Sequence, residues 1–228
     1  MELSEITLID KPVGITSFDV IRRLRKHYTA THDGEKAPKM GHAGTLDPLA
    51  SGLMVLGVGS GTKKLTELTK LDKEYVAEIR LGERRSTGDL EGEVLEKVLV
   101  PEVDVEQVKE VVNEMVGVLT LPVSAYSAIK KDGVPMYKRA RAAAAQGEAV
   151  TEVPYRDMEV YQAEVLSAAC ESEWCVVTVR FYVASGVYIR SLAEEFGKRL
   201  GFPATLQNLR RTKVGEFAVE DALQLPEV

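Results

Sequence analysis

The residues best suited to chemistry lie in the segment GHAGTLDPLASG, which runs from Gly41 to Gly52. It places one acidic side chain, Asp47, in a loop of small residues directly before an apolar run. An ionised carboxylate in such a loop could act as a nucleophile or remove a proton. The bland alternative is that the Asp-Pro pair marks only a turn. The glycines on both sides favour a functional loop, because they allow a backbone or a ligand to approach closely.

A second glycine-rich segment, GVGSGTKK, invites comparison with phosphate-binding loops. It departs from the Walker spacing because Thr62 follows Gly61 where that motif needs a lysine. It also departs from the dinucleotide pattern, since its third glycine falls one position early. We therefore interpret it as a tight turn into a helix, which disfavours a nucleotide-dependent oxidoreductase.

The third feature is Arg190 in the segment ASGVYIRSL, where a strand pattern gives way to a helix pattern. A cation in the first turn of a helix opposes the helix dipole unless an acidic group lies nearby. Arg190 therefore predicts a specific carboxylate close to it. A plain surface arginine is the alternative.

Charge alone leaves the question of nucleic-acid binding open. The net charge is −6 and the pI about 5.3, which argues mildly against a general nucleic-acid coat protein. The basic residues nevertheless fall into three groups, and folding could gather them on one face. The alternative is that they are ordinary charged helix faces. The groups are Lys11, Arg22, Arg23, Arg25, Lys26, Lys36 and Lys39; Lys130, Lys131, Lys138, Arg139 and Arg141; and Lys198, Arg199, Arg210, Arg211 and Lys213.

The composition excludes several classes of protein. With 45% hydrophobic and 28% charged residues, the chain has the composition of a globular domain. Cys170 and Cys175 are its only cysteines, and with three histidines they cannot form the usual zinc ligand sets. We expect both thiols to be reduced and at least half-buried, and we expect neither a metal nor a cofactor. No apolar run reaches membrane-spanning length and no signal-peptide core is present, so we expect a soluble, cytoplasmic protein.

The elements that must position these residues follow from periodicity and capping signals. Thr16 and Ser17 are the candidate caps of the first helix, Asp104 caps a later one, and Gly201 ends the last. We expect a single α+β domain around a mixed, largely antiparallel sheet. The expected strands span 6–9, 53–58, 74–81 and 176–183, with a hairpin over 127–136; the helices span 18–28, 104–115, 137–145 and 189–200, with another beginning at Thr62; 29–43 is expected to be a mobile polar loop.

Six segments, in this order, resemble the bacterial tRNA pseudouridine-55 synthase family of the TruB type. The resemblance covers nearly the whole chain, from about residue 6 to about residue 225. One such segment is modest evidence, whereas six in order are specific. The segments are KPVGITSFDV, GHAGTLDPLASG, KEYVAEIRLG, YSAIKKDG, SGVYIRSL and LRRTKVG.

The resemblance implies a role for each matching residue. Asp47 matches the catalytic aspartate, Tyr75 the tyrosine that stacks on the target base, and Arg190 the arginine that pairs with the catalytic carboxylate. Further residues match positions that contact or enclose the flipped nucleotide, and one lysine, with the proline after it, matches a motif that supports the site. These residues are His42, Tyr188 and Leu209, and Lys11 with Pro12.

The implied activity is the isomerisation of uridine 55 in the T-loop of tRNA. It needs neither cofactor nor metal, and we expect a monomer that binds the T-arm without an obligate protein partner. The alternatives are a guide-dependent rRNA pseudouridine synthase and a non-catalytic RNA-binding module or tRNA chaperone on the same fold.

The sequence also departs from the family pattern. Pro122-Val123-Ser124 stands where members often carry a proline pair, and Ser86 stands where an aspartate is common, although Asp89 is kept. Many members continue into a small C-terminal RNA-binding domain, which we expect to be absent.

Overall fold

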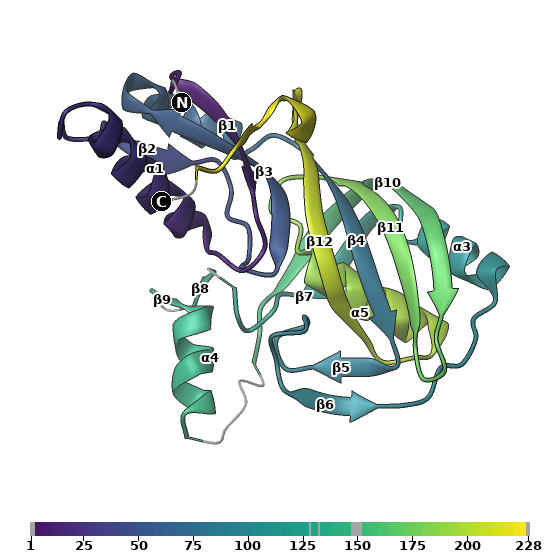
Figure 1. Cartoon of the computed structure of the whole chain (residues 1–228). Coiled ribbons are helices and arrows are strands. Elements are labelled where there is room, and N and C mark those ends of the chain that lie inside the picture. Colours follow the sequence, from purple (N-terminus) through teal and green to yellow (C-terminus); the bar gives the residue numbers. More distant parts are fainter. Residues whose placement is uncertain (1–2, 128, 132, 147–151, 227–228) are drawn as a thin grey trace. The chain divides into compact units, whose positions relative to one another are not determined.

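The structure is a computed structural model that describes residues 3–127, 129–131, 133–146 and 152–226 (Figure 1). The chain divides into two compact units, and each is described by itself. The first unit comprises Met1–Val76, Phe181–Ser185 and Asn208–Val228, and the second comprises Ala77–Arg180 and Gly186–Gln207. The strands β4 (Lys73–Leu81), β11 (Cys175–Val183) and β12 (Ala204–Val214) have residues in both.

The first unit is built on strands in the order β14-β1-β3-β12, with β2 beside β3 and β13 beside β12. Strands β1 and β3 are antiparallel, whereas β1 with β14 and β3 with β12 are parallel. The predicted first strand and first helix are confirmed. Its elements are β1 (Ile6–Lys11), α1 (Ser17–Thr31), β2 (Met40–His42), β3 (Ala50–Val58), the 3-10 helix η1 (Gly59–Lys64), α2 (Leu65–Leu68), β13 (Phe217–Ala218), η2 (Val219–Asp221) and β14 (Leu223–Gln224).

The second unit contains the strand run β4-β11-β10-β7, together with two hairpins and three helices among its described residues (Figure 1). The pairs β7–β10, β5–β6 and β8–β9 are all antiparallel. The expected α+β class with a mixed, largely antiparallel sheet is therefore confirmed. Its further elements are β5 (Glu83–Arg85), β6 (Val94–Lys97), α3 (Val105–Glu114), β7 (Gly117–Pro122), β8 (Lys130–Lys131), β9 (Val134–Pro135), α4 (Met136–Ala144), β10 (Tyr155–Cys170) and α5 (Ile189–Leu200).

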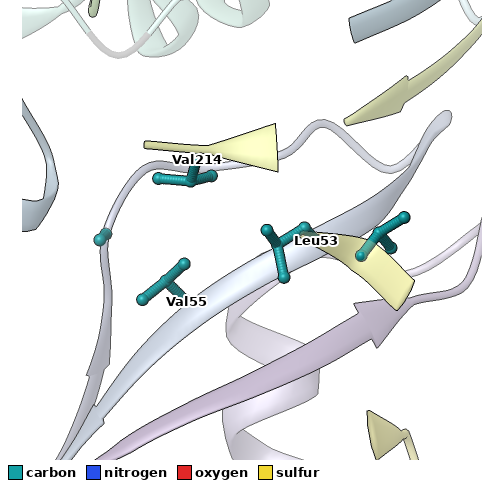
Figure 2. Packing of buried hydrophobic residues seen from close by; sticks show 5 residues of the cluster. Leu53, Val55 and Val214 are labelled. Carbon is teal, nitrogen blue, oxygen red and sulfur yellow. The ribbon is translucent and has the colours of Figure 1, made fainter. Parts of the chain in front are cut away.

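A cluster of buried hydrophobic residues packs around strand β3 in the first unit (Figure 2). Leu53 and Val55 of β3 pack with Ala43, Val214 and Val219, and all five are buried. Truncating a buried leucine to alanine costs about 2–5 kcal/mol, because transfer energy is lost and a cavity remains. Ala43 follows β2 and Leu53 lies in β3, so this cluster anchors the chain on both sides of Asp47.

The glycines of GVGSGTKK allow close packing of backbones. A Cβ on Gly61 would overlap the carbonyl of Glu5, and one on Gly57 would lie 2.7 Å from the Gly61 carbonyl oxygen. The segment turns from β3 directly into the 3-10 helix η1, which begins at Gly59 rather than at Thr62. The prediction of a tight turn into a helix is confirmed.

The two cysteines differ from the sequence expectation. Cys170 ends β10 and Cys175 begins β11, and a disulfide joins them. The expectation of reduced thiols is wrong for this structure. The reason is geometric, since β10 and β11 are neighbouring strands joined by a short turn that brings the two Cα atoms to 4.0 Å. Among the described residues, no helix is long and apolar enough to cross a lipid bilayer.

Candidate active site

Asp47 lies in the loop between β2 and β3, residues 43–49, which we call the Asp47 loop. Asp47 is half-buried, and its carbonyl oxygen accepts a hydrogen bond of 3.1 Å from Ala50 N. The Asp-Pro pair therefore does form a turn. That turn is also held in place by side chains from distant parts of the first unit.

Three groups between the end of β1 and the start of α1 hold the residues on either side of Asp47. The Ser17 hydroxyl accepts from Leu46 N at 2.8 Å and donates to Leu46 O at 3.0 Å. On the other side of Asp47, Pro48 O accepts hydrogen bonds from Gly14 N at 2.8 Å and Lys11 Nζ at 3.4 Å. Both neighbours of Asp47 in the chain, Leu46 and Pro48, are thus tied to residues 11–17.

Lys11 is fully buried at the end of β1. Its Nζ also donates to the carbonyl oxygens of Pro12 at 2.9 Å and Ile15 at 2.8 Å. Satisfied donors make the burial of a lysine tolerable. This position fits support of the loop, and contact of Lys11 with a substrate stays a prediction.

Arg211 approaches the same loop from strand β12 and is 1% exposed. Its Nε donates to Leu53 O at 2.7 Å and its Nη2 to Gly44 O at 3.2 Å, so it joins the start of the loop to β3. Sequence reasoning placed Arg211 only in a basic group. No local sequence pattern could indicate that Arg211 holds the loop, because 167 residues separate it from Gly44.

Lys73 is a second buried cation near Gly44, and a Cβ added to that glycine would lie 3.9 Å from Lys73 Cε. Its Nζ donates to Thr69 O at 2.6 Å and to Ser185 Oγ at 3.3 Å. Burial, and next the charge of Arg211, lower the pKa of Lys73 from 10.5 to about 8, although Asp72 opposes the shift. At neutral pH Lys73 therefore remains a cation.

His42 ends β2, directly before the Asp47 loop, and is half-buried. Burial first, and the nearby charge of Arg211 second, hold the pKa of His42 below its ordinary 6.5, whereas a hydrogen bond with the Gly44 backbone opposes the shift. Its imidazole is therefore neutral at pH 7. Its Nδ1 is buried and has no hydrogen-bond partner among the described residues.

The two other candidate residues of the first unit lie on neighbouring strands. Tyr75 is 8% exposed and shares the buried face of β4 with Lys73, two residues earlier. Leu209 lies on β12 in register with Ala50, the first residue after the Asp47 loop. The structure thus places Leu209 beside the end of that loop.

Arg190 belongs to the second unit, where it lies in the first turn of α5 and is buried. Its Nη1 lies 3.4 Å from Asp89 Oδ2 and donates to Thr87 O at 2.9 Å, and its Nη2 contacts Tyr126 O at 3.5 Å. The predicted carboxylate beside Arg190 is confirmed. Sequence reasoning did not identify Asp89 as that carboxylate, and its pairing with Asp47 stays a prediction.

Asp89 is itself held in one orientation. Its Oδ1 accepts hydrogen bonds from the Thr87 hydroxyl and from Glu91 N, and the residue is 3% exposed. One sequence feature could have identified Asp89. The segment ERRSTGDLEG keeps this acidic position of the family pattern, although Ser86 departs from it. Only the fold reveals which cation it meets.

Tyr188 is the N-cap residue of α5 and is half-buried. Its carbonyl accepts hydrogen bonds from Ser191 N at 3.0 Å and Leu192 N at 3.2 Å, so its backbone begins the helix that carries Arg190. Glu194 lies one turn of α5 beyond Arg190. Burial raises the pKa of Glu194, although the charges of Arg84 and Arg190 oppose the shift.

A cavity of about 770 Å³ lies elsewhere in the second unit, along β7 and α5. Its lining includes Leu119, Ser191 and Glu194, but none of the seven candidate site residues. Among the described residues, no group of three His, Cys, Asp or Glu side chains is arranged to hold a metal ion.

The fold is that of the pseudouridine synthases. Two solved structures share the fold across 96% of this chain: an H/ACA RNP bound to a substrate RNA containing 2′-deoxyuridine, at 27% identity and a TM-score of 0.65, and a Cbf5-Nop10-Gar1 complex, at 26% and 0.66. This chain spans about half the length of each matched chain, 50% and 52%.

Sequence comparison assigns the family. Residues 26–189 match the N-terminal domain of the TruB family of pseudouridylate synthases, and the chain belongs to that family. Relatives named tRNA pseudouridine synthase B include those of Corynebacterium efficiens, 39% identical over 99% of this chain and 72% of the relative; Leifsonia xyli, 42% over 97% and 70%; and Chloroherpeton thalassium, 37% over 96% and 86%.

Proposed function

We propose that this chain isomerises uridine 55 in the T-loop of tRNA to pseudouridine, with Asp47 as its catalytic carboxylate. The observation that carries the proposal is the likeness to proteins named tRNA pseudouridine synthase B, at 37–42% identity over nearly the whole chain. The tightly held Asp47 loop supports it, because a catalytic carboxylate must keep a fixed geometry.

The reaction breaks the N1–C1′ bond of uridine, turns the uracil and joins C5 to C1′. The proton on C5 leaves and N1 gains one, so no redox step is needed. Asp47 either attacks C1′ or removes a proton from the sugar. The target base must first leave the RNA stack, which costs a few kcal/mol.

The family resemblance assigns roles to the other residues, and these roles suit the proposed chemistry. Tyr75 stacks on the uracil, and its hydroxyl is suited to assist the departure of the C5 proton. The resemblance further implies that Arg190 pairs with Asp47, and a cation in that role would favour the ionised carboxylate. The resemblance also implies that His42, Tyr188 and Leu209 contact or enclose the flipped nucleotide, and the His42 imidazole is neutral at pH 7.

A guide-dependent synthase is the second candidate, since the chain shares a fold with the H/ACA RNP and Cbf5 structures. Their 26–27% identity is well below the 37–42% found with tRNA pseudouridine synthase B. We therefore favour a tRNA enzyme that acts alone as a monomer and recognises the T-arm.

The test is to map pseudouridine in an unmodified tRNA transcript after incubation with the purified chain. We expect modification of the T-loop uridine without a guide RNA or a second protein. Modification that requires an added guide RNA would favour the second candidate. Binding of tRNA without any modification would favour a non-catalytic chaperone.

A further inference from the structure

Ser17 has a hydroxyl whose contacts are not explained by its place in a helix. It is the first residue of α1, and the sequence suggested that it caps this helix together with Thr16. The cap is instead Thr16 alone, whose hydroxyl accepts from Asp19 N at 3.1 Å in a reciprocal capping box. The Ser17 hydroxyl points away from that box and bonds only to Leu46 in the described residues.

The Ser17 contact is directed at the backbone next to Asp47. The side chain is 2% exposed, and its oxygen bonds both the N–H and the C=O of Leu46, 29 residues further along the chain. The Leu46 carbonyl belongs to the peptide plane that joins Leu46 to Asp47. Holding that plane restricts the backbone rotation that aims the Asp47 side chain.

We propose that Ser17 is a positioning residue that fixes the orientation of the Asp47 carboxylate. The inference rests on the proposed function, in which Asp47 performs the chemistry. A misplacement of about 1 Å in a catalytic group can lower the rate about 100-fold, even when the substrate still binds. Ser17 therefore acts on the chemical step rather than on RNA affinity.

The rest of the loop remains anchored when the Ser17 hydroxyl is removed. Arg211 still holds Gly44, and Gly14 and Lys11 still hold Pro48. Ser17→Ala should therefore fold and loosen only the Leu46–Asp47 peptide. This makes the variant a specific probe of positioning.

Thr16→Ala is the matched control. It removes the cap of the same helix, one residue earlier, but Thr16 contacts Asp19 rather than the Asp47 loop. Thr16→Ala weakens the start of α1, so any loss of activity that comes only from a disturbed helix start should appear in this variant. Only Ser17→Ala removes the contact with Leu46.

The experiment measures single-turnover pseudouridine formation and tRNA Kd for wild type, Ser17→Ala, Thr16→Ala and Asp47→Asn, with Tm for each. We expect Ser17→Ala to lower the rate about 100-fold. The tRNA Kd of Ser17→Ala should stay within about threefold of wild type. The single-turnover rate and the tRNA Kd of Thr16→Ala should also stay within about threefold. Hydrogen exchange in peptides covering residues 45–48 should speed up in Ser17→Ala alone.

Near-normal turnover in Ser17→Ala, or an equal loss in both variants, would overturn the inference while the proposed function stands, provided that Asp47→Asn is inactive. If wild type makes no pseudouridine, or if Asp47→Asn retains normal turnover, the assignment of Asp47 fails and the inference fails with it. The two failures are therefore distinguishable in one set of measurements.

Discussion

Around Asp47, three buried cations hold backbone carbonyls. Lys11 bonds Pro48, Arg211 bonds Gly44 and Leu53, and Lys73 lies near Gly44. All three donate hydrogen bonds to backbone carbonyls, and the charge of Arg211, second to burial, lowers the pKa values of His42 and Lys73. The first unit therefore combines a rigid carboxylate loop with a local positive potential suited to an anionic substrate.

The lowered pKa of His42 makes a contribution to stability that depends on pH and can be measured. Because the folded-state pKa lies below 6.5, the unfolded chain binds a proton between the two values that the folded chain does not. The stability that this shift contributes is full above about pH 6.5 and is lost as the pH falls through the folded-state pKa. We expect the urea midpoint to fall less between about pH 7.5 and about pH 5 in His42→Gln than in wild type.

The control for this titration is His32→Gln, since His32 lies exposed after the end of α1. This variant should show the same decrease as wild type. An equal decrease in His42→Gln would contradict the lowered pKa of His42.

In the second unit, the contribution of the buried Asp89–Arg190 ion pair to stability can be tested by substitution. Asp89→Asn removes one charge of the buried Asp89–Arg190 ion pair, so we expect the free energy of unfolding to fall by about 3 kcal/mol or more. Glu173→Gln removes one partner of the exposed Lys97–Glu173 pair and should cost under about 1 kcal/mol. Urea titration of both variants gives the comparison, and equal small losses would show that the Asp89–Arg190 pair is not important for stability.

Sequence alone predicts part of this site. The small-residue loop identifies Asp47, and the cation in the first turn of a helix predicts a carboxylate near Arg190. Ser17, Asp89 and Arg211 could not be assigned in this way, because each acts on a backbone or a charge far away in the sequence. Only the fold decides such pairings.

At the scale of elements, the parallel pairing of β3 with β12 brings Arg211 to the loop. Gly52 lies opposite Arg211 with a φ of +104°, and a Cβ there would overlap the Arg211 carbonyl and lie 2.8 Å from its nitrogen. Here the sequence expectation of a close backbone approach at a flanking glycine is confirmed.

Gly52→Ala should therefore displace Arg211 as well as strain the backbone. We expect a loss of unfolding free energy above about 3 kcal/mol, because strain and overpacking add. Gly34→Ala is the control, since Gly34 has a φ of +84° but no atom within 4 Å of an added Cβ. It should cost about 1–2 kcal/mol. If thermal or urea unfolding gives equal losses, the close approach is not what requires glycine at position 52.

Local signals predict most helices and strands well. Asp104 is the N-cap of α3 and Gly201 ends α5, as expected from capping chemistry. The polar stretch expected to be a loop over 29–43 instead holds the end of α1 and the strand β2, because pairing with β3 orders it. The long strand β10 was missed and the cysteines were expected to be reduced, since both depend on cross-strand pairing.

At the scale of the whole molecule, family membership connects the loop to a reaction. The TruB family match and the fold agree, while the roles of individual residues are proposals that the family resemblance implies. The central claim is that the Asp47 carboxylate carries out the isomerisation, rather than merely shaping a turn. Asp47→Asn keeps the size of the side chain and removes its charge.

The most direct measurement follows tritium released from C5 of the uridines in labelled tRNA, because C5 loses its proton only when it bonds to C1′. We expect wild type to release the tritium of the T-loop uridine. Asp47→Asn should be at least about 10⁴-fold slower, as for the loss of other essential nucleophiles. Its tRNA affinity should be unchanged or tighter, since a negative charge is removed. Substantial release by Asp47→Asn, with the fold intact, would contradict the account.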